Sequence, residues 1–135
     1  MRKAATIAGV LIFLLVGVLS AAAPVRADAD QATIARNLAE NVLGRGLVRT
    51  SRIDDNGRGL TIRWESATFK PANPAPHTRE MLQTEAQFAA ESIFRVLGSI
   101  RDINFEIVQG RRSLASGRAS RDRPFRIAFT GDLGR

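Results

Sequence analysis

The chain has 135 residues, of which 20 are Lys or Arg and 13 are Asp or Glu, giving a formal net charge of +7. This length is sufficient for one domain, and 44% hydrophobic with 24% charged residues is typical of a globular protein. Because the chain has no cysteine and only one histidine, His77, we exclude a disulfide scaffold, a cysteine nucleophile, a lipid-modified cysteine and any thiolate or histidine-rich metal site.

The first 27 residues have the pattern of a secretory signal peptide. Arg2 and Lys3 form a positive start, and an apolar run follows from Ile7 to Leu19. Small residues then lead to Val25-Arg26-Ala27, where signal peptidase would cleave. We therefore predict an exported protein that is periplasmic, secreted or associated with the cell wall.

Cleavage is expected after Ala27, with Ala23 and Ala29 as nearby alternatives. The competing interpretation is an uncleaved anchor, because residues 4–25 are long enough to span a bilayer. Both interpretations place residues 28–135, a single predicted domain, outside the cytoplasm. Cleavage after Ala27 would remove three basic residues and no acidic one, so the net charge would fall from +7 to +4.

The first half of this domain is predicted to be a helix followed by a β-hairpin. Residues 30–43 form the helix, between an N-cap at Asp30 and a C-cap at Gly44. Its apolar face is predicted from the four-residue spacing of Ile34, Leu38 and Val42, flanked by Ala35 and Leu43. Strands over residues 47–53 and 59–69 follow, joined by a turn at Asp54–Gly57.

The second half repeats this order and adds a strand. Three prolines make residues 71–77 a loop, after which Thr78 caps a helix that runs to Leu97. The face of this helix that packs on the core is predicted to contain Leu82, Ala86, Ala89, Ile93 and Val96. Alternating residues then predict strands over 103–107, 113–119 and 124–130, and the last residues, 133–135, are expected to be frayed.

These elements predict an α+β fold, a two-layer sandwich with two helices on one face of a mainly antiparallel sheet of about five strands. The order is αββ-loop-αβββ. A shift of 54 residues aligns Val42-Leu43-Gly44 with Val96-Leu97-Gly98, which raises the hypothesis of an αββ duplication.

No constellation of catalytic or metal-binding residues stands out, so we predict no catalytic residue, metal or other cofactor. His77 has no nucleophile or orienting carboxylate beside it in a pattern typical of a triad. Asp54–Gly57 offers oxygen ligands, but a cation and a strand follow where a calcium loop needs further ligands. Glu65 and Glu106 interrupt strands at outward positions, where cross-strand ion pairs are the expected role.

Arginine is the most suggestive feature. All 20 basic residues except Lys3 and Lys70 are arginine, and six arginines fall within residues 111–126 beside one acid. Planar guanidinium groups suit phosphate, sulfate and carboxylate. The candidate anion-binding residues are Arg63, Arg111, Arg112, Arg118, Arg121, Arg123 and Arg126. A compositional bias of the genome is the alternative explanation for the same residues.

The sequence supports three hypotheses about the function of the protein. The leading hypothesis is an exported, non-enzymatic module that binds another envelope protein or has a structural role in the envelope. The alternative is arginine-mediated binding of an anionic envelope polymer or lipid head-group on the open sheet face and the hairpin over residues 110–126. A hydrolase using His77 is the third. Export excludes intracellular nucleic acid as a partner, and membrane contact is expected only if the N-terminal segment stays attached.

Overall fold

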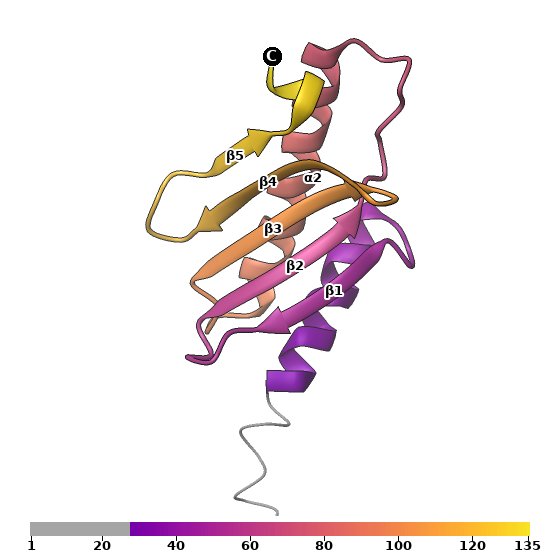
Figure 1. The fold of residues 1–135 in the computed structure, drawn as a ribbon. Helices are drawn as coiled ribbons and strands as arrows, with labels where there is room; N and C mark the ends of the chain where they lie inside the picture. The colour runs from indigo at the N-terminus through magenta and orange to yellow at the C-terminus, as the bar shows by residue number, and fades with distance from the viewer. Residues whose placement is uncertain (1–27) are drawn as a thin grey trace, which may run out of the picture.

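A computed structural model describes residues 28–135, so the predicted signal peptide lies outside the described residues. An N-terminal helix occupies residues 28–43. The remaining elements are β1 (Val48–Ile53), β2 (Gly59–Glu65), α2 (Ala75–Val96), β3 (Asp102–Gln109), β4 (Arg112–Ser120), β5 (Arg126–Phe129) and the 3-10 helix η1 (Gly131–Gly134), shown in Figure 1.

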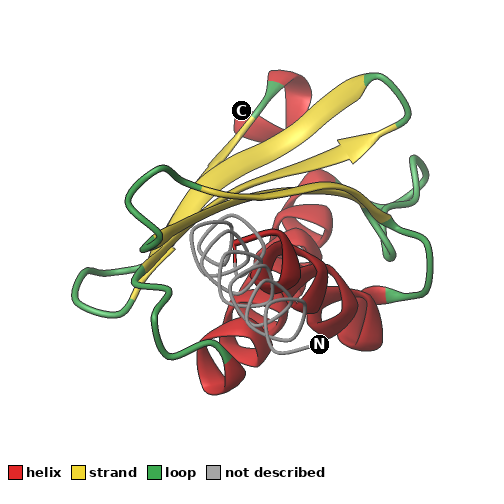
Figure 2. Cartoon of the chain, turned by 90° about the horizontal axis from the view of Figure 1, so that it is seen from below, coloured by secondary structure: helices red, strands yellow, loops and turns green. Residues whose placement is uncertain are grey.

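The five strands form one sheet in the order β1-β2-β3-β4-β5. All neighbours are antiparallel except β2 and β3, which are parallel and are joined through α2. A parallel pair needs such a crossover because its strands run in the same direction. Both helices cover the same face of the sheet (Figure 2), so the predicted two-layer α+β sandwich is confirmed.

The topology does not repeat one αββ unit. Because β2 and β3 are parallel neighbours, β3 runs opposite to β1 while both helices lie on one face. Each hairpin can be viewed from the helix face with its own first strand pointing upward. In the β1–β2 hairpin the second strand then lies on one side of the first, and in the β3–β4 hairpin it lies on the opposite side. Two units of opposite hand cannot be superposed by rotation. The match at 54 residues therefore reflects the element order and common residue types.

Strand alternation determines which side chains form the core. Leu60, Ile62 and Trp64 of β2 are at most 1% exposed and face the helices, as the predicted alternation requires. Ile103, Phe105 and Ile107 occupy the matching positions of β3 and are also buried. Apart from Gly59 and the buried Val108, the alternate positions of the same strands carry polar and charged residues, which lie on the open face of the sheet.

The buried face of the N-terminal helix differs from the predicted one. Ala35 and Ala39 are fully buried, whereas Ile34 and Val42 are 40% and 47% exposed. Leu38 of the predicted stripe and its flanking residues Ala35 and Leu43 do pack on the core, but Ala39 takes part in that contact where Ile34 and Val42 were expected. The outer positions therefore keep large apolar side chains in solvent.

The ends of α2 and of the chain also correct the prediction. The helix begins at Ala75 with Pro74 as N-cap, because proline is tolerated in a first helical turn. Thr78 is therefore a buried helical residue rather than a cap. Val96, predicted to pack on the core, is 57% exposed. At the C-terminus Leu133 is buried within η1, and its carbonyl accepts a hydrogen bond from Arg79 at 3.0 Å, so this end is not frayed.

Candidate functional site

The seven candidate arginines do not form one cluster. Arg111 and Arg112 lie at the β3–β4 turn, whereas Arg118, Arg121, Arg123 and Arg126 lie at or near the other end of β4. A nine-residue strand is about 27 Å long, so one small anion cannot contact both groups. The cluster seen in the sequence is therefore divided by β4.

Two of the candidates on the open sheet face are ion-paired. Arg63 Nε lies 3.0 Å from Glu106 Oε1, out of line for a hydrogen bond, so this cross-strand contact is Coulombic. Arg118 Nη2 lies 3.5 Å from Asp102 Oδ2. The four side chains of these two pairs are between 31% and 46% exposed, and ion pairs with this much solvent access contribute little to stability.

Arg121 caps the C-terminal end of α2. Its Nε donates to the carbonyl of Ile100 at 2.7 Å, and its Nη2 donates to the carbonyls of Leu97, at 3.1 Å, and of Phe94. The guanidinium also stacks over the Phe94 ring at 4.7 Å from its centroid. A cation in this position satisfies helix carbonyls and suits the negative end of the helix dipole. Arg121 therefore has a structural role that its sequence context did not reveal.

Arg126 and Arg118 face each other directly across the β4–β5 ladder. Asn104 of β3 is the next residue in the same row, opposite Arg118. Like charges directly opposite each other are unfavourable in a sheet. No ion pair of Arg126 is found within residues 28–135, so its side chain is the less neutralised of the two.

The same ladder contains a hollow of about 890 Å³ beside Gly117. Its lining comes from both faces of the sheet. Asn104, Ser116, Arg118, Arg126 and Ala128 belong to the open face, Phe105, Phe125 and Ile127 belong to the helix face, and Gln83 comes from α2. Glycine is required at position 117, because a Cβ there would lie 2.0 Å from the Arg126 carbonyl oxygen and 2.6 Å from Phe105 Cζ. The polar side chains therefore border the hollow on the open face of the sheet, and the aromatic and aliphatic side chains border it on the helix face.

A second hollow of about 420 Å³ lies between α2 and the end of the β4–β5 pair. Phe94 and Ala90 of α2 meet Ala119 and Phe125 there, with Gln87 at its border. Phe125 lines both hollows and stacks on Phe105 with ring centroids 5.6 Å apart. The helix side of β5 is therefore incompletely covered.

These hollows could not be predicted from the sequence, apart from one local signal. Gly117 was the available signal, since glycine inside a strand marks a close approach of another chain segment. Gln87 and Phe94 belong to the flank of α2, and only the placement of that helix beside β4 gives them a role. Phe125 is partly buried and packs against the core.

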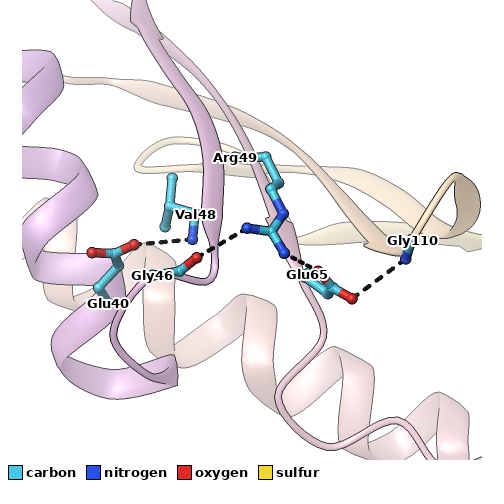
Figure 3. Close-up of polar contacts among 6 residues, drawn as sticks. All are labelled: Glu40, Gly46, Val48, Arg49, Glu65 and Gly110. Atoms are coloured by element: carbon cyan, nitrogen blue, oxygen red, sulfur yellow. Dashed lines mark hydrogen bonds and ion pairs between the residues drawn. The ribbon is translucent and has the colours of Figure 1, made fainter.

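Glu65 forms a separate polar network at the opposite end of the sheet (Figure 3). Its carboxylate forms an ion pair with Arg49, which also donates to the Gly46 carbonyl at 3.1 Å, and accepts a hydrogen bond from the Gly110 N–H at 3.4 Å. The Arg49 guanidinium, followed by the Gly110 N–H, lowers the pKa of Glu65 below its ordinary value. The expected cross-strand ion pair is thus present, and it joins β1, β2 and the β3–β4 turn.

Glu85 is a buried carboxylate that sequence reasoning did not single out. It is 5% exposed, yet it accepts hydrogen bonds from the Trp64 indole at 3.3 Å, the Ser66 hydroxyl at 2.6 Å, the Ala67 N–H at 3.0 Å and the Thr68 hydroxyl. These four donors satisfy the charge without a cation. Glu85 thereby fixes the start of the β2–α2 loop against the core.

The remaining candidates have simpler surroundings. His77 is exposed in the first turn of α2. Asp54–Gly57 forms the β1–β2 turn, closed by hydrogen bonds from the Gly57 N–H to the Asp54 carbonyl at 2.9 Å and from the Asp54 N–H to Gly59 at 2.8 Å. Across residues 28–135, no three His, Asp or Glu side chains are grouped so that they could hold a metal ion.

No family model, curated protein or solved structure matches this chain. In the part of the chain that the structure describes, no helix combines the length and apolar character needed to cross a bilayer. The function is therefore inferred from the residues of the β4–β5 ladder themselves.

Proposed function

We propose that this protein is an exported, non-enzymatic binding module, and that its β4–β5 ladder receives an anionic group of an envelope component. Arg118 and Arg126 would contact that group, with Asn104 and Ser116 as neutral hydrogen-bonding neighbours. The observation that supports this assignment is the direct opposition of two arginines beside a hollow. A carboxylate, sulfate or phosphate group placed between them would relieve their repulsion and accept their forked hydrogen bonds.

The test uses heparin, a sulfated polymer, as the anionic probe. The purified protein is applied to a heparin column at low salt and eluted with increasing salt, which weakens contacts between exposed charges. We expect Arg126→Ala to elute at clearly lower salt than the wild type. Arg111→Ala is the matched control, because it removes the same charge seven residues along the ladder from Arg118, the partner of Arg126, which is about 23 Å away. Equal elution of the two variants would show that only overall charge matters.

Export is tested separately from binding. The full chain is expressed in a Gram-negative bacterium, and its periplasmic fraction is analysed by mass spectrometry. We expect a mature N-terminus at Asp28, which follows the predicted cleavage site at Ala27. Recovery of the intact chain from the membrane fraction would instead support the anchor interpretation, and recovery from the cytoplasm would contradict export.

A further inference from the structure

We infer that the free edge of β5 accepts an extended segment of a partner protein in which acidic residues alternate with large apolar residues. The inference rests on the proposed function, because it names the partner chemistry of the same ladder. Strand addition of this kind uses main-chain hydrogen bonds for affinity and alternate side chains for specificity. Three features of β5 support it.

The first feature is the edge itself. β5 is the last strand of the sheet and pairs with β4 on one side. In an antiparallel strand every second residue directs its N–H and C=O away from its partner. Over Arg126–Phe129 these outward groups form a short hydrogen-bonding edge that another strand can use.

The second feature is the charge on the open face. Arg126 is exposed there, and Arg118 lies behind it in the same row. A strand added beside β5 would place its own open-face side chains next to Arg126. Acidic side chains at those positions would meet two guanidinium groups, whereas basic side chains would be repelled.

The third feature is the incomplete helix layer. Five strands spaced about 4.8 Å apart make a sheet about 24 Å wide, whereas two adjacent helices about 10 Å apart cover about 20 Å. The N-terminal helix contacts β1, through a hydrogen bond of 2.7 Å from Ser51 to Ala32, and α2 packs on β3 and β4. The 3-10 helix η1 contacts α2 and β5 beyond Phe129, so the uncovered width falls at the start of β5, beside Phe125 and Ile127.

The smaller hollow and the helix-face part of the larger one occupy this uncovered width. Phe125, Ile127 and Phe94 line them and remain only partly buried. The remaining space is about half a helix wide, so it does not suit a third helix. It suits the inward side chains of one added strand, and the apolar lining selects large apolar residues. The alternation of acidic and apolar residues follows from the two faces of β5.

The test measures binding of fluorescent synthetic peptides by anisotropy. One peptide alternates glutamate with phenylalanine and isoleucine, a second has lysine in place of glutamate, and a third is the glutamate peptide N-methylated at every second residue. The purified full chain is used in whatever processed form expression yields. We expect the glutamate peptide to bind, and the lysine and N-methylated peptides to bind at least tenfold more weakly.

Variants of the protein locate the site. Arg126→Glu should weaken the glutamate peptide about tenfold and strengthen the lysine peptide, while Arg111→Glu should change neither. Gln87→Trp should weaken binding by partly filling the hollow. Thr84→Trp is its control, because Thr84 is exposed on the same helix and lines neither hollow.

The outcomes separate this inference from the proposed function. If heparin retention depends on Arg126 but the glutamate and lysine peptides bind equally, the strand inference is wrong and the anion-binding proposal stands. If neither heparin nor peptide binding depends on Arg126, both are wrong. A self-associated protein whose dimer is broken by Arg126→Glu, and which excludes the peptide, would make a second copy the occupant and overturn the inference.

Discussion

Glu85 offers the sharpest test of how this cysteine-free domain is held together. We expect Glu85→Leu to destabilise the domain strongly and Glu85→Gln to do so less. The two carboxylate oxygens of Glu85 accept different kinds of hydrogen bond. Oε1 accepts from two donors that cannot rotate, the Trp64 indole and the Ala67 N–H. Oε2 accepts from the hydroxyls of Ser66 and Thr68. A glutamine can keep its oxygen at the first position and place its amide nitrogen at the second.

The magnitudes follow from what each substitution leaves unpaired. Leucine removes all four acceptor contacts, and Trp64 is 1% exposed, so its indole N–H cannot regain water. One orphaned buried donor costs about 1–3 kcal/mol, and loss of the loop contacts adds to this, so we expect about 3 kcal/mol in total.

Glutamine at position 85 conflicts with one donor only, the Ser66 hydroxyl. The Ser66 hydroxyl already accepts the N–H groups of Thr68, at 3.2 Å, and Phe69, at 3.0 Å, so it must donate toward residue 85. An amide nitrogen there opposes that donor, which we expect to cost about 1.5 kcal/mol.

The assay is urea unfolding followed by the fluorescence of Trp64, the single tryptophan of the chain. A loss of 3 kcal/mol corresponds to a midpoint lower by about 2 M for a domain of this size. Glu91→Gln is the control, because Glu91 is exposed on the same helix and its ion pair with Arg95 is worth about 0.5 kcal/mol or less. Equal losses for Glu85→Leu and Glu85→Gln would refute the acceptor argument and make the charge itself the cause. No loss for either would show that the network contributes nothing.

Three further predictions use the same unfolding measurement. Gly117→Ala should lower the free energy of unfolding by about 2 kcal/mol or more, because a Cβ at this position has no space. Gly98→Ala is the control and should change it by about 0.5 kcal/mol or less, because nothing lies within 4 Å of a Cβ there. Equal effects of the two substitutions would contradict the close packing of β5 on Gly117. Because the pKa of Glu65 is lowered in the folded state, its contribution to stability is present at neutral pH and is lost as the pH falls below the ordinary pKa of a glutamate and through the lowered one. Glu65→Gln should therefore be less sensitive to acid than the wild type in urea midpoints. Arg121→Ala should cost about 1–2 kcal/mol by uncapping α2, and an unchanged midpoint would exclude that role.

The fold was predictable because its signals are local. Alternation in Leu60, Ile62 and Trp64 identifies a half-buried strand from a few neighbouring residues, and prolines mark the loop before α2. The helix faces were less predictable, since spacing alone does not show whether Ile34 or Ala35 lies against the neighbouring elements. That choice depends on how closely the helix approaches its neighbours, which is a property of the packed structure.

The site was less predictable because it depends on which residues become neighbours in space. Nothing local shows that Arg126 lies opposite Arg118 or that Arg121 lies beneath the end of α2. Arg121 and Arg126 belong to the same short segment, yet Arg121 caps a helix and Arg126 faces a second arginine, Arg118. A run of arginines in sequence is therefore a poor guide to a binding surface until strand register is known.

The opposed arginines also bear on whether the abundance of arginine is only compositional. A genome-wide bias would explain why arginine is common, but it would not determine the position of each one in the sheet. Direct opposition of like charges costs about 0.2–1 kcal/mol, and in the free protein the ion pair of Arg118 with Asp102 offsets only part of that cost because Arg126 has no such partner among the described residues. A bound anion reverses that cost, and binding to the folded state alone adds stability in proportion to the logarithm of the ligand concentration. The pair is thus unfavourable in the isolated domain and favourable in a complex, which is the energetic pattern expected of a binding site and not of a structural ion pair such as Arg63–Glu106.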